Sequence, residues 1–342
     1  MTRQPTVLDV AEIAGVSRQT VSNVLNSPHI VRPDTRERVE EAIKQLGYRP
    51  HASARRLRTR KSSTIGIRLD PVTNGISGSV LDRFLHALTE QADAFGLRVL
   101  LFTARDPDDE IAQFERLLDG ADVDGFVLTS TTYEDPRTEW LLEHDAPFVT
   151  FGRPWGAADV YDPRHRWVDV DGHHGVAEAT RGMLELGVSH VAYLGWPPPS
   201  GTGDERRLGW RDTMLAAPGL GLREPDLDAL EIACEDGVEQ GSTAVRALLA
   251  RGVRVDAVVC ASDSLALGAL MVLGTSVPIV GYDNTPVAAA VKLSSVEQPL
   301  EQAAGAALEL FRAVGPRGDS FDPDGSANDP DHRLLRPRVF WR

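Results

Sequence analysis

The stretch 6–26, TVLDVAEIAGVSRQTVSNVLN, decides how this chain begins to fold. Its apolar residues recur at helical spacing and predict two short helices joined by a tight turn. Thr6 and Asp9 match a capping box before the first helix, and Gly15 supplies a left-handed residue to end it. Ser17 can cap the second helix. The apolar face of the first helix consists of Val7, Val10, Ala11 and Ala14.

The second predicted helix divides its residues between two faces. At about 100° per residue, Val21, Val24 and Leu25 fall on one side and pack inward. The other side carries compact hydrogen-bonding residues in place of the usual Glu/Lys mixture, namely Arg18, Gln19, Ser22 and Asn23. A plain helical hairpin with a solvated face is the alternative. The pattern favours a helix-turn-helix whose second helix enters the major groove of DNA.

A third helix is predicted over 33–46. Pro33 suits the first helical position, Asp34 suits the positive end of the helix dipole, and Gly47 ends the helix. Arg32 occupies the cap position, and loss of a good cap costs about 1 kcal/mol. We expect a phosphate contact by Arg32 to compensate for the missing cap.

Within the segment 51–61, HASARRLRTRK, residues 52–58 have helix-forming composition but are far fewer than the roughly 12–15 residues that an isolated helix needs in water. We therefore expect it to be disordered in the free protein and helical on DNA. Arg55, Arg56 and Arg58 can hold phosphates. A flexible charged linker is the alternative.

These stretches resemble the amino-terminal domain of the lactose-repressor (LacI/GalR) family. The resemblance continues through STIGI (63–67), RLGWRDTM (207–214), ASDSLALGAL (261–270) and VGYDN (280–284), and so covers essentially the whole chain. It implies that the hinge segment pairs with that of a second copy and inserts Leu57 into the minor groove, with Ala54 beside the partner helix.

DNA recognition is assigned from side-chain chemistry. Arg can bond guanine in a bidentate manner, and Gln or Asn can bond adenine, so Arg18, Gln19 and Asn23 are the predicted base-reading residues. The hydroxyl residues contact phosphate or support the helix. The complete predicted set is Thr6, Ser17, Arg18, Gln19, Thr20, Ser22, Asn23, Arg32, Ala54, Arg55, Arg56 and Leu57.

The charge of the chain is unevenly distributed. Residues 1–62 carry 12 basic and six acidic residues, a net charge of +6. The whole chain carries −14, so the remainder carries −20. This asymmetry is typical of a small basic module attached to an acidic body that phosphate repels.

Composition restricts the other classes of function. The amino terminus has no signal-peptide core, and no apolar run reaches the length of a membrane span, so we expect a cytoplasmic protein with no membrane partner. Cys234 and Cys260 show no metal spacing. The chain has no Walker loop, GxSxG or HExxH motif. We expect no catalytic residue, metal or cofactor, and an enzyme on an α/β fold is a remote alternative.

From residue 64 onward, apolar strand-like runs alternate with amphipathic helices, a pattern that predicts parallel sheets covered by helices. Two such series predict two lobes, and the family resemblance implies a periplasmic-binding-protein-like (type I) fold. The expected parts are a helix-turn-helix headpiece (1–50), a hinge (51–62), an amino-terminal lobe (63–162 with 291–325) and a carboxyl-terminal lobe (163–290 with 326–342).

Ligands of open parallel sheets bind beyond the carboxyl ends of the strands, here between the lobes. Asp70, Arg153 and Asp171 follow predicted strands. By resemblance, Arg206 and Asp283 match the family's effector-binding arginine and cleft aspartate, and Ser262 stands where the lactose repressor has asparagine. Trp155, Trp196 and Trp210 are candidates for either apolar walls of the site or core packing.

The resemblance implies a homodimer on a near-palindromic operator, acting as a repressor. The segment between Gly268 and Gly281, near the family's dimer interface, is shorter than the family pattern, and LLRPRVFWR (334–342) carries no heptad repeat for a tetramer. Most relatives sense sugars, so we expect a sugar or oligosaccharide to release the DNA. A corepressor that is a purine or another metabolite is the alternative.

Overall fold

The computed structural model describes residues 5–26, 28–48, 62–70, 76, 78–156, 158–313 and 330–342. The chain divides into two compact units, Met1–Ser62 and Ser63–Arg342, which we describe separately. Four predicted hinge residues lie outside the described part of the chain, namely Ala54, Arg55, Arg56 and Leu57. None of the described helices is long and apolar enough to cross a membrane.

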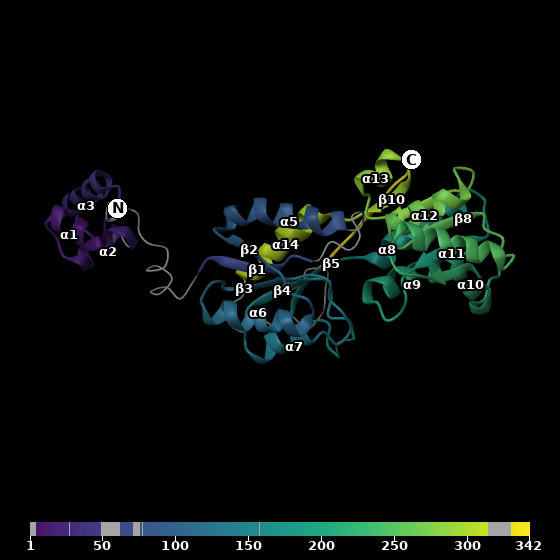
Figure 1. Cartoon of the computed structure of the whole chain (residues 1–342), viewed down its shortest axis with the longest axis horizontal. Coiled ribbons are helices and arrows are strands. Elements are labelled where there is room, and N and C mark those ends of the chain that lie inside the picture. The colour runs from purple at the N-terminus through teal and green to yellow at the C-terminus, as the bar shows by residue number, and fades with distance from the viewer. Residues whose placement is uncertain are drawn as a thin grey trace. The chain divides into compact units, whose positions relative to one another are not determined.

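The smaller unit contains the predicted helices (Figure 1). They are α1 (Val7–Ala14), α2 (Arg18–Asn26) and α3 (Pro33–Leu46), with a 3-10 turn η1 (Pro28–Ile30) after α2. Thr6 and Asp9 form the predicted capping box. Gly15 and Gly47 end α1 and α3 with φ values of 65° and 62°. The sequence therefore predicted these three helices correctly, together with the ends of α1 and α3.

One residue of this unit departs from the prediction. Val21 and Val24 are buried in the same core as residues of α1 and α3, but Leu25 is 36% exposed. Leu25 lies about 100° around α2 from Val24, outside the stripe that the other two helices cover. The prediction that Leu25 packs inward was wrong.

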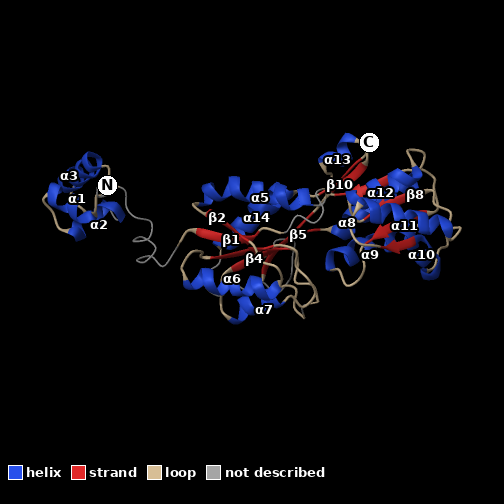
Figure 2. Ribbon diagram, in the orientation of Figure 1, coloured by secondary structure: helices blue, strands red, loops and turns tan. Residues whose placement is uncertain are grey.

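The larger unit contains two sheets flanked by helices (Figure 2). The first sheet has the order β11-β5-β4-β3-β1-β2 with parallel pairing throughout, and we call this half the N-lobe. Its strands are β1 (Thr64–Arg68), β2 (Arg98–Phe102), β3 (Gly125–Leu128), β4 (Phe148–Phe151), β5 (Arg166–Val170) and β11 (His332–Leu335).

Helices cover both faces of the N-lobe sheet. Val127 of β3 belongs to the core beneath α5 (Gly78–Ala92) and α14 (Leu300–Arg312), and η2 (Asp93–Phe95) follows α5. The neighbouring Phe126 belongs to the core beneath α6 (Pro107–Asp119) and α7 (Pro136–Glu143). Successive strand residues point to opposite faces, so the two cores lie on opposite sides of the sheet.

The second sheet has the order β12-β10-β9-β8-β6-β7, and we call this half the C-lobe. Its strands are β6 (Val191–Gly195), β7 (Glu231–Ala233), β8 (Ala257–Cys260), β9 (Ile279–Tyr282), β10 (Ser294–Glu297) and β12 (Arg338–Phe340), the last antiparallel to β10. Its helices are α8 (Gly172–Glu185), α9 (Gly201–Ala216), α10 (Glu224–Leu230), α11 (Val238–Ala250), α12 (Asp263–Leu273) and α13 (Pro286–Ala290).

Strand pairing moves the predicted lobe boundaries. β5 was expected in the C-lobe but completes the N-lobe sheet beside β4, and β11 pairs with β5 in the same sheet. β10 was expected in the N-lobe but pairs with β9. The chain therefore crosses between the lobes after β5, β10 and β11. An apolar run shows that a strand forms, but it does not show which sheet provides the hydrogen bonds.

The contact between α11 and α12 gives a test of the C-lobe packing. A Cβ atom on Gly268 would lie 2.3 Å from the carbonyl oxygen of Val238, so Gly268→Ala forces the two helices apart. We expect its free energy of unfolding in urea to fall by about 1–3 kcal/mol, the usual cost of overpacking. Gly78→Ala is the control, because no atom lies within 4 Å of its Cβ position. Equal stability of the two variants would contradict this packing.

Candidate functional site

The exposed face of α2 carries the predicted base-reading residues. Arg18 and Gln19 are exposed, and Asn23 is half-buried. The Nε2 of Gln19 donates a hydrogen bond to Oδ1 of Asn23 at 3.0 Å, one turn along the helix. This bond holds the two amides side by side on one face, each with further donors and acceptors available to a ligand.

Several of the predicted DNA contacts serve as helix caps. The backbone N–H of Thr20 donates to Oγ of Ser17 at 3.0 Å, which caps α2. The hydroxyl of Thr6 donates to Asp9 at 2.7 Å within the capping box of α1. These residues fix the start of each helix, and so they position the face of α2.

The remaining headpiece candidates are Arg32 and Ser22. Arg32 is exposed before α3 and makes no side-chain cap, as the sequence predicted. Ser22 is half-buried on α2. Arg32 is therefore exposed to solvent, as the predicted phosphate contact requires.

In the C-lobe, Arg206 of α9 carries a guanidinium that is almost fully buried. Its Nη1 donates to the carbonyl oxygen of Ala261 at 2.6 Å. Its central carbon lies 3.6 Å from the ring centroid of Tyr282 and 5.1 Å from that of Trp196. Its Nε is buried without a hydrogen-bond partner among the described residues. The guanidinium is therefore packed between aromatic rings with a donor still unused.

Asp283 follows β9 and lies next to this guanidinium. Its Oδ1 is 4.0 Å from Nη2 of Arg206 and accepts a hydrogen bond from Nε2 of Gln298 at 2.7 Å. Burial raises the pKa of Asp283 to about 7, although Arg206 acts in the opposite direction. Asp283 also has a φ of 107°, a backbone conformation that costs about 1–3 kcal/mol in a residue with a side chain. Strain of this kind is concentrated at functional sites.

Ser262 contacts the same region through an aspartate that the sequence analysis missed. Its Oγ accepts from the backbone N–H of Leu265 at 3.2 Å, capping α12, and donates to Asp236. Asp236 also accepts from Nε1 of Trp196 at 3.3 Å. Asp236 follows β7, a strand of three residues that is too short to form an apolar run in the sequence. The signal for Asp236 is its place after a strand, and the strand itself went unpredicted.

Arg153 joins the two lobes. Its Nε donates to Asp169 of β5 at 2.7 Å, and its Nη2 forms an ion pair with Glu205 on α9 of the C-lobe. Burial raises the pKa of both carboxyls, and Arg153 opposes that shift. The predicted Arg153 therefore belongs to a buried charge cluster, and Glu205, which was not predicted, is its partner across the lobes.

Two predicted aspartates have local partners. Asp171 lies where the chain enters the C-lobe, and its Oδ1 accepts from the backbone N–H of His174 at 2.8 Å, which caps α8. Asp70 accepts from the hydroxyl of Ser130 at 3.0 Å and forms an ion pair with Arg68 within the N-lobe. Arg206, Asp283 and Ser262 are thus gathered around the C-lobe strand ends, whereas the contacts of Asp70 lie apart from them.

The three tryptophans separate into two roles. Trp210 is fully buried, and its Nε1 donates to the carbonyl oxygen of Val191 at 3.1 Å, so it is a core residue. Trp196 and Trp155 are half-buried, and each lies beside an arginine of the candidate site. Trp155 and Trp196 therefore remain candidates for walls of a binding cleft.

Comparison with known proteins agrees with this geometry. Residues 6–51 match the model for bacterial regulatory proteins of the lacI family. Residues 78–277 match the model for periplasmic binding proteins and the sugar binding domain of the LacI family.

Similar proteins cover nearly the whole chain. The transcriptional regulator CelR of Thermobifida fusca is 37% identical over 87% of this chain and 88% of its own length. AglR of Rhizobium meliloti is 33% identical over 97% of this chain and 92% of its own.

Solved structures show the same fold. A complex of the transcriptional regulator CelR with cellobiose is 29% identical, covers 99% of both chains and has a TM-score of 0.67. The lac repressor dimer bound to operator has a TM-score of 0.75 at 21% identity, over 99% of this chain and 98% of that one. By its headpiece, its two-lobed body and its relatives, this chain belongs to the lacI family of DNA-binding transcriptional regulators.

Proposed function

We propose that this regulator is a repressor that leaves its operator when a saccharide binds between the two lobes. The observation that carries the proposal is the buried Arg206 guanidinium, with an unused donor, beside Asp283 at the strand ends of the C-lobe. Buried polar groups need partners, so a donor left without one here favours a polar ligand.

The chemistry of the cleft favours a saccharide. Arginine and carboxylates bond to hydroxyl groups, and Trp196 offers a flat apolar surface to a sugar ring. The similar regulator CelR was solved with cellobiose. The second candidate for the effector is a purine or another metabolite that acts as a corepressor. It is not favoured, because the similar regulator CelR was solved with a sugar.

The headpiece supplies the DNA-binding half of the function. We infer that two copies bind a near-palindromic operator, each with the exposed face of α2 in the major groove. We infer that this regulator works in the cytoplasm, where its operator lies, and that its role is regulation and not catalysis.

Contacts between the lobes offer a route for the response. Arg153 pairs with Glu205 across the lobes, and the hydroxyl of Tyr133 donates to Asp204 of α9 at 3.3 Å. A ligand that engages Arg153 competes with Glu205 for its guanidinium, so it alters the relative stability of lobe arrangements. We infer that the predicted hinge, 51–61, transmits this change to the headpiece.

Isothermal titration with mono- and oligosaccharides tests the proposed ligand class. We expect wild type to bind a saccharide and Arg206→Met to lose at least about tenfold in affinity, since it removes charge-assisted bonds. Arg207→Met is the matched control, because Arg207 is next on the same helix and pairs with Glu231 of β7, outside the candidate site. Equal affinity in the two variants, or no saccharide bound, would contradict the proposal.

The face of α2 gives a second prediction. Gln19→Ala should weaken operator binding by about 1–3 kcal/mol and leave binding to random DNA nearly unchanged, because a lost base contact reduces specificity only. Gln45→Ala, an exposed glutamine on α3, should change neither affinity. Fluorescence anisotropy on both DNAs measures the difference, and an equal loss on both would count against base reading by Gln19.

The raised pKa of Asp283 predicts a pH-dependent effector affinity. Below pH 7 the buried carboxyl is protonated, and above pH 7 it is the stronger, charged acceptor of a sugar hydroxyl. We expect saccharide affinity to rise about tenfold between pH 6 and 8 for a group of pKa about 7. Asp283→Asn should remove this rise, and a rise that persists in the variant would assign it to another group.

A further inference from the structure

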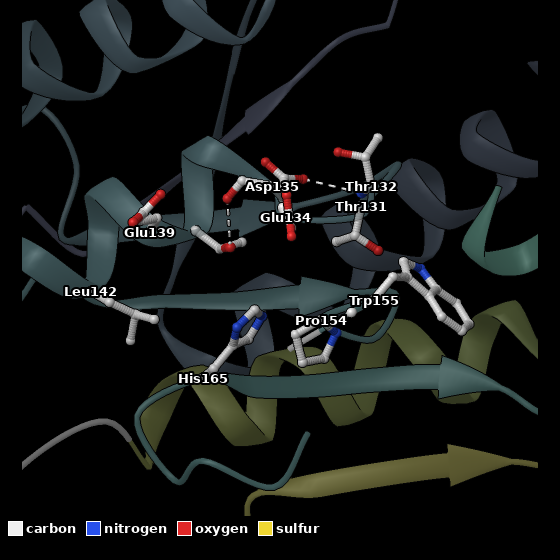
Figure 3. A pocket seen from close by; sticks show the side chains of 11 residues that line it. Thr131, Thr132, Glu134, Asp135, Glu139, Leu142, Pro154, Trp155 and His165 are labelled. Carbon is white, nitrogen blue, oxygen red and sulfur yellow. Dashed lines mark hydrogen bonds between the residues drawn. The ribbon is translucent and has the colours of Figure 1, made fainter. Parts of the chain in front are cut away.

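A pocket in the N-lobe is lined by one of the candidate cleft residues, Trp155, and by none of the charged candidates. Its volume is about 480 Å³, within the roughly 300–1,000 Å³ that is usual for ligand sites. Figure 3 shows the residues around it: the segment before α7 and α7 itself on one side, and Pro154 and His165 on the other. The side chains that matter are Thr131, Glu134, Glu139, Leu142, Trp155 and His165.

Trp155 connects this pocket to the residues of the proposed effector site between the lobes. Its ring lies 4.7 Å from the guanidinium carbon of Arg153, measured to the centroid. It also lies against the start of α9 in the C-lobe, where a Cβ on Gly201 would be 2.1 Å from the ring. Trp155 thus borders the pocket, the charge cluster of Arg153 and the opposite lobe at once. The pocket is therefore adjacent to the proposed effector cleft, with Trp155 between them.

The lining of the pocket is suited to hydroxyl groups. The indole Nε1 of Trp155 is buried and has no hydrogen-bond partner among the described residues. Glu134 and Glu139 are exposed carboxylate acceptors, and Thr131 contributes a hydroxyl. Burial lowers the pKa of His165 to about 4, so its ring is neutral at pH 7. Its Nε2 donates to the hydroxyl of Thr150 at 3.2 Å, because that hydroxyl already donates to Gly152, and Nδ1 is left as an acceptor. The carboxylates disfavour an anion, and the combination favours a neutral, hydroxyl-rich ring.

We propose that this pocket is a second saccharide subsite, so that the effector is an oligosaccharide with one part in the cleft and another beyond Trp155. The proposal rests on the proposed saccharide effector and deepens it. It predicts that affinity depends on the length of the sugar and that residues of α7 act only on the longer sugars.

Isothermal titration of the full chain without DNA tests the subsite. The ligands are glucose with cellobiose, cellotriose and cellotetraose, and a matching series of malto-oligosaccharides. Wild type should gain about tenfold in affinity when the chain extends into the pocket, the effect of one or two added hydrogen bonds to charged groups.

Three variants locate that gain. Glu139→Gln should lose most of the tenfold gain and leave the shorter sugar unaffected. Leu142→Trp fills the pocket with a ring and should also reduce the affinity for the longer sugars only. A near-normal affinity for the shorter sugar would show that this variant is folded. Glu143→Gln is the control, since Glu143 is exposed on the same helix but does not line the pocket.

The outcomes separate the two proposals. Equal affinity for all lengths, or a gain that survives in both Glu139→Gln and Leu142→Trp, would overturn the second subsite and leave the saccharide effector standing. Failure of every sugar in both series to bind would contradict the saccharide effector itself, and the subsite with it.

Discussion

A positive charge buried inside a protein must be surrounded by groups that replace water, and in this chain that requirement falls on Arg206. Arg206 is 4% exposed, and the C-lobe surrounds its guanidinium with the ring of Tyr282, the carbonyl oxygen of Ala261 and the carboxyl of Asp283. The three partners lie at or just beyond the ends of neighbouring parallel strands. The order of strands in the sheet therefore decides which side chains can meet the charge.

The same principle organises the border between the lobes. Arg153 is also largely buried, and its carboxylate partners come from both halves of the body: Asp169 from β5 and Glu205 from α9. An ion pair that is removed from water is sensitive to the loss of either partner. Any ligand that contacts one member of this cluster therefore changes the energy of the contact between the lobes. We propose that a response to the effector begins with this change between the lobes.

Much of this arrangement was predictable from the sequence, and the exceptions have physical causes. The headpiece follows local rules, since caps such as Thr6 and stops such as Gly15 act within one turn of chain. Arg206 and Asp283 came from resemblance, and the structure brings them together. Asp236 could not be predicted, because it follows a strand of three residues whose pairing partner lies far away in sequence.

The predicted lobe boundaries were wrong for a related reason. Strand β5 has the same apolar character whichever sheet it joins, and only its hydrogen bonds to β4 and β11 show that it belongs to the N-lobe. Trp210 could not be assigned from the sequence, because a tryptophan close in sequence to a predicted site residue can line the site or pack in the core. In the structure Trp210 packs in the core of the C-lobe.

The central claim is that sugar binding in the body and DNA binding in the headpiece are coupled. Titration of labelled DNA from upstream of the gene, followed by fluorescence anisotropy with and without saccharides, measures that coupling directly. We expect at least one saccharide to weaken operator binding about 5- to 150-fold, the usual range of allosteric coupling. An operator affinity that no saccharide changes, or one that a purine strengthens, would contradict it.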